Sequence, residues 1–216
     1  GLLERAEALR GQRTRRDLEG RAVVLLFLSP SLRTRVSMEL ASKELGAKVV
    51  TLQAGGLMHT LELEEGVVMR GEGAEHIREA VGVLARYGDL LAVRAFPKGE
   101  SWAEDRRDPV LRAFLRHSPV PVVNLESSRY HPCQALADAY TIRRELGPEP
   151  GRLVLTWADH PRPLPVAVPS SFARAATRMG GDLTVTHPDG YDLPEEVVAS
   201  CGRFAREAGG RFEVTG

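Results

Sequence analysis

Short apolar runs alternate with amphipathic segments of helix length along almost the whole chain. Strands separated by helices favour parallel sheets covered by helices, because parallel strands need a long crossover connection. The pattern therefore predicts an α/β fold. The predicted strands are Ala22–Leu28, Lys48–Gln53, Asp89–Val93, Val120–Leu125, Leu153–Trp157, Leu183–Thr186 and Arg211–Val214. The predicted helices are Ser31–Leu45, Ala74–Tyr87, Pro109–His117, Pro132–Leu146, Val166–Met179 and Pro194–Ala208.

The segment Gly147-Pro148-Glu149-Pro150-Gly151 interrupts this alternation, since prolines and glycines favour a linker over a helix. We expect a first domain over residues 1–146 and a second over residues 151–216. The second would hold only three strands and two helices, which leaves a sheet edge and an apolar face uncovered. We therefore expect that the second domain is incomplete in this chain.

Composition argues against several classes of protein. Lys+Arg and Asp+Glu both number 29, so the zero net charge argues against a broad basic surface for nucleic acid. No apolar run approaches the roughly 20 residues that cross a bilayer, and the first residues lack the layout of a signal peptide. Cys133 and Cys201 have no metal-ligand spacing and suit a reducing compartment. We expect a cytoplasmic protein that binds no nucleic acid, membrane or metal.

A polar run, Ser31-Leu32-Arg33-Thr34-Arg35, follows the first predicted strand and opens an amphipathic segment. The first N–H groups of a helix have no internal partner, and the helix dipole favours an anion there. The planar guanidinium of Arg33 matches phosphate geometry. The run predicts an oxyanion site. The alternative is that Ser31 is a helix N-cap followed by solvated arginines.

A second polar cluster, His131-Pro132-Cys133-Gln134, also lies between an apolar run and a helix. His131 and Gln134 are three residues apart and share a helix face. Pro132 suits the first helical turn. A histidine at this position can donate a hydrogen bond to a carbonyl oxygen, and the glutamine can bond an amide. The alternative is a helix-capping histidine beside a surface glutamine.

Arg94 and Glu126 each follow a predicted strand. Right-handed crossovers place the carboxyl ends of parallel strands on one edge of the sheet, where ligands bind, so Ser31, Arg94 and Glu126 should gather there. A buried arginine or carboxylate is costly without a partner of opposite charge. A ligand is one candidate partner for each side chain, and a structural ion pair with a local residue is the other.

The two clusters resemble the motifs of a known enzyme superfamily. Ser31-Leu32-Arg33-Thr34-Arg35 resembles the Ser-x-Arg-Thr-Arg signature of the aspartate/ornithine carbamoyltransferase superfamily, and His131-Pro132-Cys133-Gln134 resembles its His-Pro-x-Gln motif. Residues 69–72, 75–76, 93–97 and 156–164 are similar to its N-acetylornithine and N-succinylornithine branch, which acts in arginine biosynthesis. The resemblance covers essentially the whole chain and implies two Rossmann-like lobes.

The resemblance also implies a role for the site residues. The first motif would bind the phosphate of carbamoyl phosphate, while Arg94, His131 and Thr34 would surround the carbonyl oxygen. Gln134 would hold the carbamoyl amide, and Glu126 would contact an N-acylated ornithine. The implied carbamoyl phosphate site comprises Ser31, Leu32, Arg33, Thr34, His59, Arg94, His131, Pro132, Cys133 and Gln134.

The loop Gly55–Glu65 resembles one that enters the active site of a neighbouring subunit, which implies a homotrimer. His59 stands where the family often has tryptophan, and Arg35 is implied to brace the structure rather than touch ligand. The implied reaction moves the carbamoyl group to the δ-amine of the acylornithine and needs no cofactor, metal or covalent intermediate.

The acyl group stays open at this point. Ala74 is neither of the residues expected for a clear assignment, and the segment 159–169 with residues 186–191 favours the succinyl type. Cys133 and the pair Met179-Gly180 favour the acetyl type, which we prefer slightly.

Two alternatives remain. Ornithine carbamoyltransferase is the first, although the loop 157–163 lacks the asparagines expected there. A non-catalytic anion-binding scaffold is the second. The incomplete second lobe supports it, since the family's His-Cys-Leu-Pro motif and substrate-binding lysines do not occur in residues 1–216.

Overall fold

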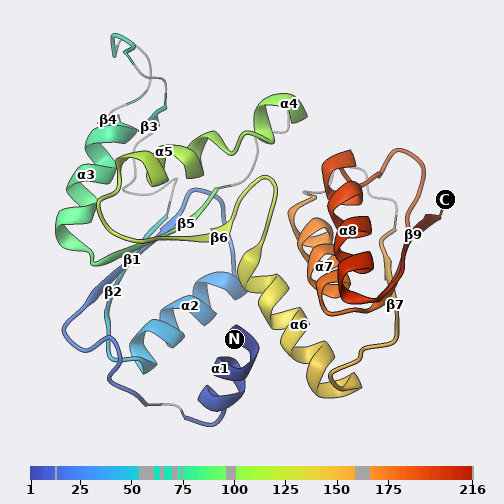
Figure 1. The fold of residues 1–216 in the computed structure, drawn as a ribbon. Helices are drawn as coiled ribbons and strands as arrows, with labels where there is room; N and C mark the ends of the chain where they lie inside the picture. Colours follow the sequence, from blue (N-terminus) through green and yellow to red (C-terminus); the bar gives the residue numbers. More distant parts are fainter. Residues whose placement is uncertain are drawn as a thin grey trace. The chain divides into compact units, whose positions relative to one another are not determined.

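Figure 1 shows the computed structural model of the chain, which describes residues 1–12, 14–53, 61–63, 66–69, 73, 75–95, 101–158 and 166–215. The backbone forms two compact units. Residues Arg10–Ser128 make up a contiguous unit, and Gly1–Leu9 with Arg129–Gly216 make up a two-segment unit. His59, Ala74 and the loop residues 159–163 lie outside the described residues. The expected division at 146 and 151 stays a prediction.

The contiguous unit is built on a parallel sheet in the order β2-β1-β5-β6. In Figure 1, α2 covers one face of this sheet, and α3 and α5 pack side by side on the other. Its strands are β1 (Ala22–Phe27), β2 (Lys48–Gln53), β5 (Leu90–Arg94) and β6 (Val122–Glu126), with a separate parallel pair β3 (Leu61–Glu62) and β4 (Glu75–His76). Its helices are α2 (Arg33–Glu44), α3 (Ile77–Tyr87), α4 (Trp102–Asp105) and α5 (Pro109–His117).

The core of this unit explains which way its functional side chains point. Val24 and Leu26 of β1, with Leu91 and Val93 of β5, are buried in one cluster with residues of α3 and α5. Each fully buried aliphatic side chain of this kind contributes about 1.5–3 kcal/mol. Because successive strand residues point to opposite faces, Arg94 points to the face that α2 covers.

The two-segment unit holds a second parallel sheet in the order β7-β8-β9. Helices α7 and α8 pack against each other, and a buried cluster joins them to β8 through Ala176, Val185 and Cys201. The elements are α1 (Leu2–Leu9), α6 (Pro132–Leu146), β7 (Arg152–Thr156), α7 (Ala167–Arg178), β8 (Asp182–Thr186), α8 (Glu195–Ala208) and β9 (Phe212–Thr215).

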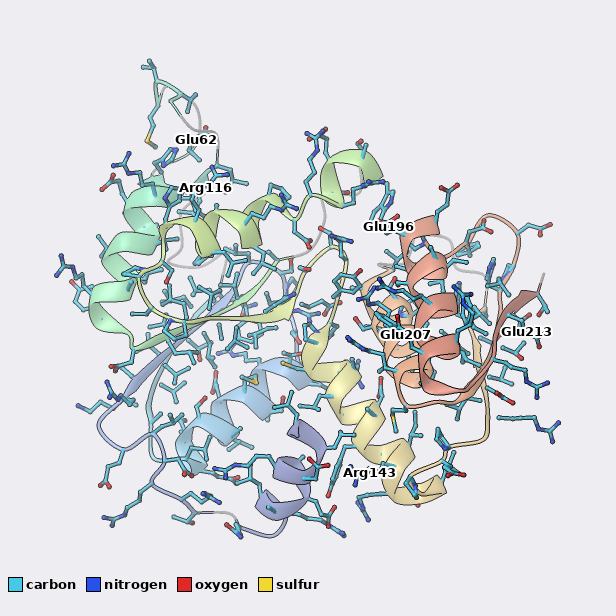
Figure 2. The ribbon with its side chains drawn as sticks, in the orientation of Figure 1. Glu62, Arg116, Arg143, Glu196, Glu207 and Glu213 are labelled. Atoms are coloured by element: carbon cyan, nitrogen blue, oxygen red, sulfur yellow. The ribbon has the colours of Figure 1, made fainter. Side chains whose placement is uncertain are left out.

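Helix α1 belongs to this second unit because it packs on α6. The Tyr140 hydroxyl donates to a carboxylate oxygen of Glu7 over 2.6 Å. Arg143, labelled in Figure 2, lies with its guanidinium 3.7 Å from Glu4. These contacts connect the two sequence segments of the unit.

The predicted α/β fold with parallel, helix-covered sheets is confirmed. The predicted start of a helix at Ala74 is wrong, because Glu75 and His76 pair with β3 and the His76 ring caps α3 by accepting from Arg78 N. Arg94 and Glu126 end their strands rather than follow them. Within the described residues, no helix combines the length and apolarity that a membrane span requires.

Candidate active site

The amino end of α2 carries concentrated positive charge. Leu32 holds the N-cap position without a side-chain cap, so the alternative in which Ser31 caps this helix is wrong. The first turn holds Arg33 and Arg35 and no acidic residue. Cations at the positive end of a helix dipole are unfavourable unless an anion lies among them. This arrangement favours an anion site.

Arg35 is engaged within the protein. Its Nε donates to Glu39 over 3.1 Å, and its terminal nitrogen donates to the side-chain oxygen of Gln53 over 2.7 Å. Thr51 donates to the same Glu39 carboxylate, and these bonds hold the pKa of that carboxyl below its usual value, the threonine bond most. Arg35 therefore braces α2 against β2, as expected.

A bulge in β6 places Glu126 opposite Arg94. Val93 pairs with Asn124, but the next residue of β5, Arg94, pairs with Glu126. The extra residue in β6 is Leu125, and in a regular register without the bulge Leu125 would pair with Arg94 instead of Glu126. Bulges of this kind re-aim side chains beside functional sites.

Arg94 and Glu126 form a buried ion pair, with side chains only 9% and 4% exposed. The local ion pair that the sequence left open is therefore the arrangement found. Burial lowers the pKa of Arg94, and the Glu126 carboxylate counteracts this; the charge of Arg33 lowers it further. Burial also raises the pKa of Glu126, against the effect of Arg94. Arg33 thus lies close enough to Arg94 for their like charges to interact.

His131 caps α6 with its own ring. Its Nδ1 accepts the backbone N–H of Gln134 over 3.3 Å, so the helix-capping histidine of the alternative is confirmed, while Gln134 is half-buried rather than a surface residue. A ring nitrogen that accepts a hydrogen bond carries no proton, and the neutral imidazole then holds its proton on Nε2. Capping therefore leaves His131 as a hydrogen-bond donor. The His131 backbone N–H donates to Ser171 Oγ over 2.7 Å.

The other motif residues have distinct surroundings. Pro132 opens α6, where a missing N–H costs nothing. Burial raises the pKa of the half-buried Cys133 thiol, which disfavours a nucleophilic thiolate. Gln134 Nε2 donates to Asp138 over 2.8 Å, which fixes the orientation of its amide. These residues belong to the two-segment unit, and their placement relative to Arg94 stays a prediction.

Asp108 is a positioning residue that the sequence reasoning missed. Its carboxylate accepts from Ser127 Oγ over 3.1 Å and from Ser128 N over 2.9 Å, which anchors the loop directly after Glu126. The backbone of Asp108 is left-handed, with φ 49°. An aspartate before a proline suggests only a helix cap. In the part of the chain that the structure describes, no cluster of three or more metal-ligating side chains occurs.

Comparison with known proteins gives consistent matches. The family model "Aspartate/ornithine carbamoyltransferase, carbamoyl-P binding domain" matches residues 1–144. An N-acetylornithine carbamoyltransferase of Xanthomonas campestris is 42% identical, over 99% of this chain and 64% of that protein. An N-succinylornithine carbamoyltransferase of Bacteroides fragilis is 37% identical, over 84% of this chain and 57% of that protein.

Solved structures agree with these relatives. An acetylornithine transcarbamylase complexed with acetylcitrulline is 42% identical and superposes with a TM-score of 0.94, over 99% of this chain and 65% of that chain. A mutant N-acetyl-L-ornithine transcarbamylase complexed with carbamyl phosphate and N-succinyl-L-norvaline also gives 0.94, at 42% identity and the same coverage. The chain spans less than two thirds of the length of these proteins.

We expect that removing one member of the buried pair destabilises the protein more than removing both. Glu126→Leu leaves the Arg94 charge buried without its carboxylate, which costs about 3–5 kcal/mol. The double variant Arg94→Met with Glu126→Leu should recover much of that loss. Urea unfolding of Glu126→Leu, Arg94→Met and the double variant measures the free energy of unfolding of each. Additive losses in the double variant would contradict the coupling.

Proposed function

The chain belongs to the aspartate/ornithine carbamoyltransferase family, and from this premise we propose that it is an N-acylornithine carbamoyltransferase. The proposed reaction moves the carbamoyl group of carbamoyl phosphate to the δ-amine of the acylornithine. The products are N-acylcitrulline and phosphate. The observation that carries the proposal is the positive end of α2, where Arg33 lies within electrostatic reach of buried Arg94.

The phosphate group belongs at the amino end of α2. An anion there relieves the repulsion between Arg33, the helix dipole and Arg94. We assign the phosphate to the backbone of Ser31, Leu32, Arg33 and Thr34 with the Arg33 guanidinium as a planar fork. Arg35 contributes structurally, because its donors are already directed to Glu39 and Gln53.

The remaining hydrogen-bond donors of the site are assigned to the carbonyl oxygen of the carbamoyl group. Arg94 is paired with Glu126, and the His131 ring that accepts at Nδ1 carries its proton on Nε2. With Thr34 they stabilise the negative charge that builds on this oxygen as the neutral δ-amine attacks. Each preorganised donor of this kind is worth about 3–4 kcal/mol in the transition state. Phosphate then leaves, and the Gln134 amide oxygen orients the carbamoyl nitrogen.

Glu126 is proposed to contact the acylornithine as well as Arg94. Its exposed fraction is only 4%, so a substrate group that reaches it must also be buried. A closed site of this kind excludes water, which protects a labile acyl phosphate. The chemistry needs no metal or cofactor, and Cys133 and Cys201, which form no disulfide, fit the reducing cytoplasm.

We propose acetyl as the acyl group, because the relatives named for N-acetylornithine match a larger share of the chain at higher identity. We further propose a homotrimer. Leu32, Val36 and Leu40 form an exposed apolar stripe along α2, and half-exposed Val50 lies on the edge strand β2. A second copy of the chain covers such a stripe well, and in a trimer the loop around His59 reaches a neighbour's site.

Arg33→Ala should reduce kcat/KM for carbamoyl phosphate by about 10- to 150-fold, since a hydrogen bond to a charged group is worth about 1.5–3 kcal/mol. Phosphate release in the presence of an acylornithine is the measurement. Arg86→Ala is the matched control, because this exposed arginine lies in the last turn of α3, at the opposite edge of the sheet. Equal and negligible turnover in the unmodified protein and Arg33→Ala would favour the anion-binding scaffold.

Isothermal titration with N-acetylornithine, N-succinylornithine and ornithine tests the acyl assignment. The acetyl compound should bind most tightly. Tighter binding of the succinyl compound would move the protein to the succinyl branch without changing the reaction. Binding of ornithine alone would end the proposal in favour of an ornithine carbamoyltransferase.

Light scattering tests the assembly. The protein should show three times the mass of one chain, and Val36→Asp should reduce that mass because it places a charge in the α2 stripe. Val83→Asp is the control, since Val36 and Val83 are both 49% exposed but Val83 lies on α3, on the other face of the sheet. A monomer in the unmodified protein, or loss of assembly in both variants, would contradict the proposed interface.

A further inference from the structure

Helix α7 contacts two adjacent residues just before α6. Ser171 Oγ accepts the backbone N–H of His131 over 2.7 Å. Three residues further along the same helix, the Arg174 guanidinium lies 5.0 Å from the centre of the Tyr130 ring. Residues three apart share a helix face, so one face of α7 contacts Tyr130 and His131 together. All four residues belong to the two-segment unit.

Ser171 provides a hydrogen-bond acceptor for the His131 backbone N–H, which has no acceptor within helix α6. His131 is the N-cap of α6, so its backbone N–H lies before the first intrahelical hydrogen bond. Both residues are buried, with His131 7% and Ser171 5% exposed. A buried N–H without a partner is strongly disfavoured, which gives this bond a structural purpose.

The same bond restricts the imidazole. The His131 ring is tied at Nδ1 to the N–H of Gln134, and its backbone is tied to Ser171. One hydrogen bond holds the His131 backbone and the other holds the ring, with the rotatable χ1 and χ2 bonds between them. The two bonds together therefore restrict the direction in which the Nε2–H group points. Loss of the backbone anchor would release the residue that donates to the carbonyl oxygen.

We propose that Ser171 is a positioning residue for carbamoyl transfer, which holds the His131 donor through the backbone and does not touch substrate. The inference rests on the function proposed above, because that function makes His131 a hydrogen-bond donor to the carbonyl oxygen, and a donor must be held in position. It ties the donor to α7, whose other side packs on the β7-β8-β9 sheet. A misplacement of about 1 Å in a reacting group can cost about a hundredfold in rate.

The adjacent serine supplies a matched control. Ser170 is 0% exposed, and within the described residues its Oγ has no hydrogen-bond partner. Ser170→Ala and Ser171→Ala thus remove the same atom from neighbouring buried positions, but only the second breaks a bond. In the full chain, Ser171→Ala should lower kcat about tenfold or more, while KM for carbamoyl phosphate stays nearly unchanged because the phosphate is held elsewhere. Ser170→Ala should keep both constants close to those of the unmodified protein.

A second measurement separates this inference from the proposed function. The chain has six histidines, so selective ¹⁵N-histidine labelling gives few signals. In Ser171→Ala the His131 amide should exchange faster with solvent, and its ring should lose the single Nε2–H tautomer. In Ser170→Ala both signatures should persist. Ser171→Cys, whose sulfur is a weak acceptor, replaces the alanine variant if that variant does not fold, with smaller shifts in the same direction.

The measurements test the proposed function and the positioning role of Ser171 separately. If the unmodified protein releases no phosphate, the proposed function fails, and the amide and ring signals still report whether Ser171 holds His131. If Ser171→Ala and Ser170→Ala show the same His131 amide exchange rate, the same ring tautomer and the same kcat, the positioning role is overturned. Faster exchange with unchanged kcat in an active enzyme also overturns it, since the bond would then be structural only.

Discussion

The register between β5 and β6 determines the chemistry available at the carboxyl edge of the first sheet. One extra residue in β6 brings Glu126 opposite Arg94, so two charges enter a buried edge as a pair. Without the carboxylate, burial would work against the charged guanidinium, and the nearby charge of Arg33 would add to the penalty. The pair therefore allows a second cation to remain beside the amino end of α2.

The alternation of apolar runs and helical segments predicted the larger elements well because their stability comes from burying one continuous face. The elements that the sequence did not predict are those without such a face. Helix α1 has no buried residue, α4 has four residues, and the β3-β4 pair has two residues in each strand. Tertiary contacts form these elements, and a local pattern does not contain those contacts. The start of α3 shows the same limit, since pairing with β3 takes Glu75 and His76 out of the helix.

The residues of the candidate site also fall into two groups, those that a local motif indicates and those that tertiary contacts position. Local motifs indicated the residues at the starts of α2 and α6, because helix starts impose their own requirements on sequence. The partners of those residues were not predictable. Whether Arg94 would meet Glu126 depended on a bulge, and a shift of one residue would have replaced the carboxylate by Leu125. Asp108 and Ser171 act on backbone groups 20 and 40 positions away, so no spacing along the chain marks them.

The order of the two units along the chain has a consequence for biosynthesis. The contiguous unit is encoded without interruption, so its sheet can close while later residues are still within the ribosome. Helix α1 precedes the contiguous unit along the chain, yet its hydrogen-bond partner Tyr140 is 133 positions from Glu7. The helix must therefore wait for α6 to emerge before it can dock. Vectorial synthesis thus completes the unit that holds Arg33 and Arg94 before His131 and the rest of α6 are available.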